Sequence, residues 1–257
     1  MRRRRFAASA LLVALGVAAP AFSTPATAAC APKTFDGAAF TVCVFDPRRD
    51  DLRLFWKGPD DKPFGSLRAV AEALKAKGER LAFAMNAGMF QADQSPVGLY
   101  VETGRLMRKA DTRGGGGSNF RLTPNGVFWI GDGAAGVTET LRYLAGQSGA
   151  RYATQSGPML VIDGRIHPRI RPDGTSAKIR NGVGVDERGD VVFAISDEPV
   201  TFDAFARLFR DGLMCRNALF LDGSLSSLYA PELGRDDQIE PIGPIVGVVQ
   251  RGAVGAK

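Results

Sequence analysis

Short apolar runs, most of which stop at a polar or glycine-containing turn, recur along the chain. Their length and their content of β-branched and aromatic residues are typical of strands. Strands of this kind are predicted at 40–46, 52–56, 81–85, 218–221 and 245–249. Two segments have apolar residues at helical spacing instead. One follows a Ser66 cap and ends at Gly78, and the other begins near Thr201.

The second predicted helix carries Phe202, Phe205 and Phe209 on one stripe, which we assign to core packing rather than to a cofactor site. Strands outnumber helices, and the two do not alternate in a sustained β-α-β rhythm. The pattern therefore predicts an α+β fold, with mixed, strand-rich sheets and two main helices in a single domain.

Residues 1–29 have the composition of a secretory signal peptide. Four arginines precede a short apolar stretch, and small residues follow at 26–28. The stretch is too short to span a membrane. The arginine-rich start fits general secretory or twin-arginine export, whereas a lipoprotein site at Cys30 lacks the usual leucine. We expect an exported protein, periplasmic or secreted, with one domain over 30–257.

Charge and cysteine content narrow the class of protein further. The leader arginines account for most of the formal charge of +6, and about +2 remains without them, so we expect no nucleic-acid partner. Three cysteines in an exported protein leave one unpaired. Cys43 could pair with Cys30, which would staple the first strand, or with Cys215.

Several familiar motifs are absent from the sequence, including Cys-x-x-Cys, His-Glu-x-x-His and the Walker phosphate loop. The single histidine, His167, excludes a multi-histidine metal centre, and Ser156 is not in a Gly-x-Ser-x-Gly elbow. We interpret the glycine-rich run Gly114–Ser118 as an active-site flap or a linker, with a phosphate-cradling loop as the alternative.

Three junctions between apolar runs and turns carry the candidate chemistry. They lie at 154–164, 179–186 and 218–227, and a rigid sheet edge often presents reactive groups at such points. Any one acid there could simply cap its turn. Together they supply arginine for an anion and carboxylates for glycosyl transfer, which indicates a substrate that is both sugar and phosphate. The candidate site residues, from these junctions and from the ends of other predicted strands, are Asn86, Ser156, Asp163, Arg180, Asn181, Asp186, Ser196, Asp197, Asp222, Ser224, Ser226 and Ser227.

Four segments, in order along the chain, resemble the phosphodiester glycosidase family. The resemblance covers residues from about 40 to 250, which is nearly the whole mature chain. The four segments are 85–90 (MNAGMF), 156–160 (SGPML), 180–186 (RNGVGVD) and 221–227 (LDGSLSS). The resemblance implies an α+β fold and cleavage of a glycosidic bond beside a phosphodiester, in an exported bacterial branch of the family. Family members often carry Asp-Gly-Gly-Gly-Ser-Ser, so Leu225 places a bulky group where glycine would leave room for a ligand.

The expected roles keep the sugar and the phosphate apart. Arg180, Asn181 and the amides around Gly157 and Gly223 hold the phosphate, and Ser156 and Ser226 also bind the substrate. Asp222 acts at the anomeric carbon as stabiliser or nucleophile, and Asp186 or Asp197 orients water or a hydroxyl. Asn86 and Ser227 position sugar hydroxyls, while His167 supports the rim of the cleft. No cofactor is required by these roles, and a divalent metal remains possible without an identified ligand set.

Two other functions fit the same residues. A protein that binds an anionic glycan without cleaving it would leave Asp222 exposed, whereas an enzyme would hold it in a concave pocket. A metal-dependent phosphodiesterase, which cuts the P–O bond, would require several carboxylates to converge on one ion.

Overall fold

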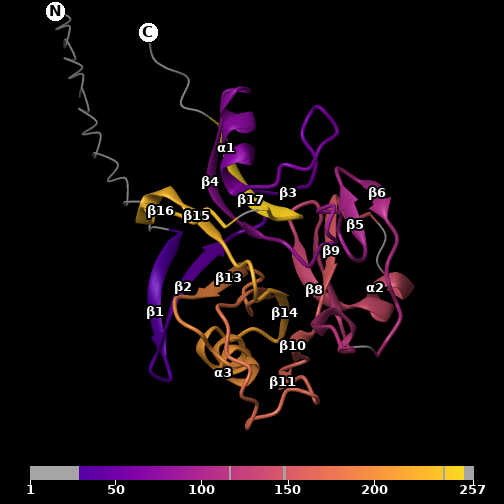
Figure 1. Cartoon of the computed structure of the whole chain (residues 1–257), viewed down its shortest axis with the longest axis vertical. Helices are drawn as coiled ribbons and strands as arrows, with labels where there is room; N and C mark the ends of the chain where they lie inside the picture. The colour runs from indigo at the N-terminus through magenta and orange to yellow at the C-terminus, as the bar shows by residue number, and fades with distance from the viewer. Residues whose placement is uncertain (1–28, 116, 147–148, 240, 252–257) are drawn as a thin grey trace, which may run out of the picture.

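The computed structural model describes residues 29–115, 117–146, 149–239 and 241–251, and all but the last residue of the predicted signal peptide at 1–29 lies outside these residues. The described strands form three sheets (Figure 1). The seven-stranded sheet has the order β1 (Cys30–Phe35), β2 (Ala38–Phe45), β13 (Val191–Ser196), β12 (Asn181–Val185), β14 (Asn217–Asp222), β10 (Met159–Ile162) and β11 (Arg165–Ile166).

The other two sheets have five strands each. The first has the order β16 (Arg235–Asp236), β15 (Leu228–Ala230), β4 (Glu79–Asn86), β17 (Ile245–Arg251) and β3 (Asp51–Phe55). The second has the order β6 (Arg105–Arg108), β5 (Tyr100–Glu102), β9 (Tyr152–Ser156), β7 (Gly126–Ile130) and β8 (Ala135–Glu139). The α+β class is confirmed. We expected mixed sheets, whereas the strand ladders in the described part of the chain are antiparallel, since no βαβ crossover joins neighbouring strands.

Both predicted helices begin where the sequence predicted, at Ser66 and Thr201. The Ser66 hydroxyl accepts from the amide of Ala69 at the start of α1 (Leu67–Lys75), and Thr201 caps α3 (Phe202–Arg207) in the same way. A π-helical turn, Leu208–Gly212, extends α3. The sequence did not reveal α2 (Thr140–Gly146), because seven residues are too few to show helical periodicity. In Figure 1, α1 lies at the top and α3 at the bottom.

The main core lies where the three sheets meet. Phe83 of β4, Phe128 of β7 and Phe193 of β13 come from different sheets and are each at most 1% exposed. The ring of Phe193 lies 4.9 Å from that of Phe83 and 5.8 Å from that of Phe128, measured between centroids. Since aromatic side chains bury large apolar areas, this contact fixes the sheets against one another and so positions the strand ends that build the site.

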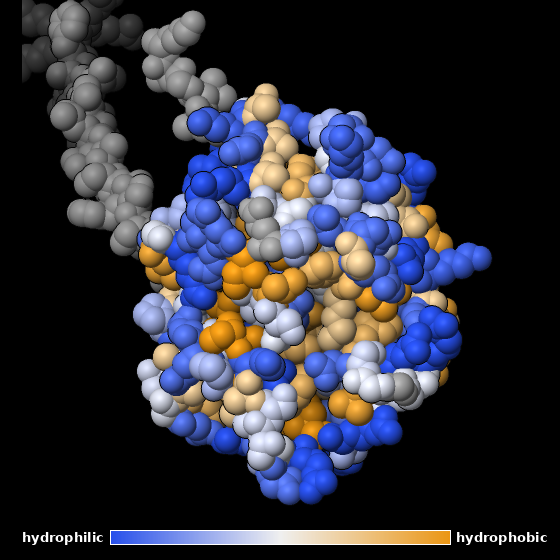
Figure 2. Space-filling model, in the orientation of Figure 1, coloured by the Kyte–Doolittle hydropathy of each residue, from blue (hydrophilic) through white to orange (hydrophobic). Residues whose placement is uncertain are grey.

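The cysteine pairing that the sequence left open is Cys30 with Cys43, which joins paired residues of β1 and β2. Cys215 is a free, buried thiol whose pKa is raised by burial to about 12. Among the described residues, no helix is both long enough and apolar enough to cross a membrane. Figure 2 shows apolar side chains gathered in a hollowed region of the viewed face, with hydrophilic side chains around it.

Candidate active site

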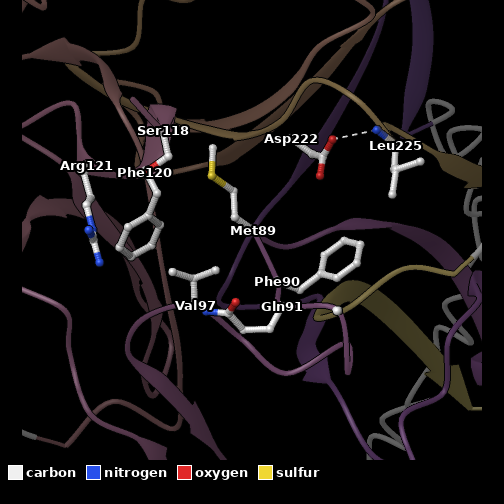
Figure 3. Close-up of a pocket in the computed structure, with 10 residues that line it drawn as sticks. Met89, Phe90, Gln91, Val97, Ser118, Phe120, Arg121, Asp222 and Leu225 are labelled. Carbon is white, nitrogen blue, oxygen red and sulfur yellow. Dashed lines mark hydrogen bonds between the residues drawn. The ribbon is translucent and has the colours of Figure 1, made fainter. Parts of the chain in front are cut away.

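A cavity of about 550 Å³ lies between two loops and the end of β14. One loop, residues 89–97, follows β4, and the other, residues 118–121, contains the 3-10 helix Asn119–Arg121. The lining is mostly apolar, with one carboxylate and one guanidinium (Figure 3). The lining residues are Met89, Phe90, Gln91, Ala92, Val97, Ser118, Phe120, Arg121, Asp222 and Leu225. Ser118 thus brings the end of the glycine-rich run to the cavity wall.

Asp222 is the last residue of β14 and supplies the carboxylate of the cavity. Its Oδ1 atom accepts hydrogen bonds from the amides of Ser224 (2.7 Å) and Leu225 (2.8 Å). Its Oδ2 atom accepts none from the described residues and points into the cavity (Figure 3). Asp222 is 7% exposed, so the carboxylate is shielded from bulk water while one oxygen faces the space that a ligand would fill.

Four residues that we expected to contact substrate form a hydrogen-bond network behind the Asp222 turn. Asn86 Nδ2 donates to a carbonyl oxygen of the turn (2.9 Å), and its Oδ1 accepts from the amide of Ser227 (2.7 Å). Asn181 Nδ2 donates to the carbonyl of Asn86 (3.0 Å), and its Oδ1 accepts from the Ser226 hydroxyl (3.2 Å). All four are at most 4% exposed, and the cavity lining includes none of them. The structure brings them together with Asp222 as supports of its turn.

Ser156 and Gly157 lie behind the cavity lining, Ser156 against β14 next to Asp222 and Gly157 against the loop that carries Phe120. Ser156 is fully buried, and its hydroxyl donates to the carbonyl of Leu221 (3.2 Å). A Cβ atom on Gly157 would lie 2.7 Å from the carbonyl oxygen of Phe120 and 2.8 Å from Cβ of Asn125. Glycine is therefore required here, because any side chain would push the end of β9 away from the loop that carries Phe120.

Arg180, which we expected to hold a phosphate, is sealed inside the protein at 1% exposure. Its Nε donates to the carbonyl of Val200 (2.9 Å), its Nη2 donates to that of Ser176 (2.7 Å), and its guanidinium lies 3.7 Å from the ring centroid of Phe202. Burial lowers the pKa of Arg180 to about 10. A Cβ on Gly223 would lie 3.2 Å from Nη1 of Arg180, so this arginine supports the turn from below.

Neither Asp186 nor Asp197, which we expected to orient water, lines the cavity. Asp186 follows β12 at the end away from Asp222, roughly 16 Å along the strand, and forms an ion pair with Arg188 (3.0 Å). Asp197 follows β13, two strands from β14, and is paired with Arg235. Asp186 therefore stabilises the turn after β12, and Asp197 links the end of β13 to Thr41 of β2 and Arg235 of β16, both outside the site.

His167 is not at the rim of the cavity, because it is 1% exposed and outside the lining. Its Nδ1 accepts from the amide of Arg169 (3.1 Å), while its buried Nε2 has no partner among the described residues. Burial lowers the pKa of His167, because the charged imidazolium is poorly solvated there. The neutral ring is therefore part of the packing.

Most of the cavity wall was not identified from the sequence. The 89–97 loop is closed by hydrogen bonds from the Gln91 amide to the Ser95 carbonyl (2.8 Å) and from the Val97 amide to the Met89 carbonyl (3.0 Å). Phe90 packs against Gly243 so closely that a Cβ there would lie 2.4 Å from Cβ of Phe90. The sequence marked the beginning of this turn, but its irregular backbone decides which side chains face the cavity.

The described residues contain no group of three or more His, Cys, Asp or Glu side chains that could hold a metal ion. Asp222 is the one acidic side chain among the residues that line the cavity. A site of the kind that hard divalent cations prefer uses several oxygen ligands. This donor set therefore does not fit the metal-dependent phosphodiesterase that we considered as an alternative.

Comparisons with known proteins agree on the family. The family model for phosphodiester glycosidases matches residues 79–249, more than half of the chain. The uncharacterized protein YigE of Escherichia coli is 33% identical over 229 residues, which cover 88% of this chain and 85% of YigE.

Solved structures share the fold at low sequence identity. The catalytic domain of zebrafish N-acetylglucosamine-1-phosphodiester alpha-N-acetylglucosaminidase, auto-inhibited by its pro-peptide, superposes with a TM-score of 0.61 at 16% identity, covering 85% of this chain and 81% of that one. A putative exported protein from Burkholderia pseudomallei gives a TM-score of 0.52 at 12% identity over 82% of this chain and 74% of that one. The extent of the family match and the identity to YigE show that the chain belongs to the phosphodiester glycosidase family.

Proposed function

We propose that this protein is an exported hydrolase that cleaves the glycosidic C–O bond of a sugar-1-phosphodiester, with Asp222 acting at the anomeric carbon. The observation that carries the proposal is the Asp222 carboxylate. One oxygen is fixed by two backbone amides, and the other faces a largely apolar cavity. Membership of the family supports the reaction class.

The chemistry needs little beyond a fixed negative charge. When the bond between C1 and the phosphate oxygen breaks, its electron pair leaves with the phosphate, and positive charge develops at the sugar ring. A carboxylate in a water-poor site stabilises that charge strongly, because its position is set before the reaction begins. Water then supplies the oxygen that ends on C1, and one of its protons is released.

The single carboxylate of the cavity fits this leaving group. Ordinary glycosidases use a second carboxylic acid to protonate the departing oxygen. A phosphate oxygen departs without such help, because the phosphomonoester product is already a stable anion. A binding protein without activity would have no need for a carboxylate held at 7% exposure with one free oxygen, so the geometry favours the enzyme.

Hydrolysis in ¹⁸O-labelled water tests the proposal directly. The purified protein is incubated with UDP-N-acetylglucosamine and with alkyl diesters of sugar-1-phosphates, and the products are analysed by mass spectrometry. Cleavage of C–O places the label on the free sugar, whereas cleavage of P–O places it on the phosphate. Label on phosphate would show a phosphodiesterase, and binding without turnover across the substrate panel would show the anionic-glycan binder; either result contradicts the proposal.

A further inference from the structure

At one end of the cavity, two arginine side chains share a single carboxylate, so one positive charge is not neutralised. Arg121, on the cavity wall, lies 3.5 Å from Asp111 through its Nη2 atom. The same carboxylate is held by Arg113 through two shorter contacts, Nε to Oδ1 (2.9 Å) and Nη2 to Oδ2 (2.7 Å). One carboxylate therefore serves two guanidinium groups, and the better geometry belongs to Arg113. The surplus positive charge lies with Arg121.

Arg121 can leave Asp111 without exposing an unpaired carboxylate. Arg113 also donates its backbone amide to Oδ1 of Asp111 (3.0 Å), so Asp111 keeps three hydrogen bonds when Arg121 turns away. These bonds, the side-chain bonds to Arg113 above all, hold the pKa of Asp111 well below its usual range, so it remains ionised. The cost of moving Arg121 towards a ligand is therefore small.

The backbone that carries Arg121 is firmly placed. The Arg121 amide donates to the carbonyl of Ser118 (3.1 Å), and Asn125 Nδ2 donates to the carbonyl of Phe120 (2.9 Å). In Figure 3, Arg121 and Asp222 stand on opposite sides of the cavity, with Met89 and Phe120 between them. An arginine with a firmly held backbone and a long side chain is suited to reach a ligand in the cavity.

We propose that Arg121, rather than the buried Arg180, binds the phosphate of the substrate, so that the phosphate lies on the Arg121 side of the cavity and the sugar on the Asp222 side. The proposal rests on the proposed function. A guanidinium binds two phosphate oxygens at once through parallel N–H donors, which a lysine ammonium does not reproduce. Arg180 is less well placed for this role, since it is 1% exposed, does not line the cavity, and its Nε and Nη2 already donate to carbonyl oxygens.

The test compares Arg121→Gln with Arg165→Gln, which removes the same charge from an exposed arginine of β11 outside the cavity. KM is measured on the cleaved sugar-1-phosphodiester, and the two products, the phosphomonoester and the free sugar, are used as inhibitors. Arg121→Gln is expected to raise KM and the inhibition constant of the phosphomonoester by roughly 30-fold, the loss of a charge-assisted contact. The inhibition constant of the free sugar should not change. Arg121→Lys is expected to recover part of the loss, and Arg165→Gln to resemble the wild type.

The outcomes separate this inference from the proposed function. If the wild type cleaves no sugar-1-phosphodiester, the proposed function fails. If the wild type is active and Arg121→Gln keeps wild-type constants for substrate and phosphomonoester, Arg121 is not the phosphate ligand and this inference alone fails. An equal loss of affinity for the phosphomonoester and the free sugar would also overturn it, because a collapsed cavity would affect both. Melting temperatures of the variants identify any such collapse.

Discussion

Replacing Asp222 with asparagine separates catalysis from folding better than any other single change in the cavity. The carbonyl of the new side chain can still accept from the amides of Ser224 and Leu225, which bond to Oδ1 at 2.7 Å and 2.8 Å. The side-chain amide nitrogen then takes the place of Oδ2, which faces the cavity. Shape and volume are kept, and the negative charge is lost.

The expected effects on stability and on turnover differ in size. Two hydrogen bonds change from a charged to a neutral acceptor, which lowers the unfolding free energy by at most about 2 kcal/mol. Part of that loss is offset, because a neutral amide costs less to bury than a carboxylate. Loss of the charge opposite the developing cation should reduce turnover about 10²-fold or more, which corresponds to about 2.7 kcal/mol of transition-state stabilisation.

Initial rates on a verified substrate and thermal melting of the same preparation measure both effects. Asp46→Asn is the matched control, since Asp46 also accepts a turn amide, that of Arg48 (2.9 Å), but lies outside the cavity. Its turnover should equal that of the wild type. Unchanged turnover in Asp222→Asn would refute the electrostatic role and leave Asp222 as the cap of its turn.

Three further changes probe the scaffold. Asn86→Ala removes two bonds to the backbone of the Asp222 turn and leaves buried groups unpaired, so the unfolding free energy should fall by about 3 kcal/mol and turnover should fall with it. The wild type should lose stability as the pH falls below about 6.5, because His167 takes up a proton more readily in the unfolded chain than in the buried folded position. His167→Gln should abolish this pH-dependent loss. Replacing Cys30 and Cys43 with serine should lower the unfolding free energy by about 3 kcal/mol, as expected for a short closed loop.

Urea unfolding measures all three changes. Identical pH dependence in wild type and His167→Gln between pH 7 and pH 5 would contradict the histidine prediction; its sign follows from a folded pKa that burial places below the unfolded value. A stable Asn86→Ala variant with full activity would show that the network is dispensable. Equal urea midpoints for the wild type and the double serine variant would show that the disulfide does not stabilise the fold.

Periodicity and cap residues sufficed for the larger elements of the fold. The predicted strand at 218–221 corresponds to β14, Ser66 caps its helix as predicted, and the second helix starts at Thr201 as predicted. These predictions succeeded because each depends on neighbouring residues alone. The antiparallel arrangement in three sheets depends on contacts between distant segments, such as β2 with β13, which no local pattern encodes.

The candidate site shows the same division. The position of Asp222 at a strand end could be predicted, because a buried run stops there. The sequence did not show that Asn86 and Asn181 would turn their side chains towards the backbone behind it. Arg121 gave no signal, since its importance comes from Asp111, a residue it meets only through the fold. Polar residues near strand ends look alike in sequence whether they face a ligand or a carbonyl.

The Asp222 turn is fastened from behind by Asn86 and Asn181, whereas the loops at 89–97 and 118–121 form most of the surface that a ligand meets. The carboxylate and the ligand-facing loops therefore depend on different contacts of the fold. Under the proposed function, changes in the loops can alter which sugar or which alcohol of the diester is accepted while the carboxylate keeps its place. Relatives that share the strand-end residues can therefore share a reaction and differ in substrate, and the loops are where such divergence should be sought.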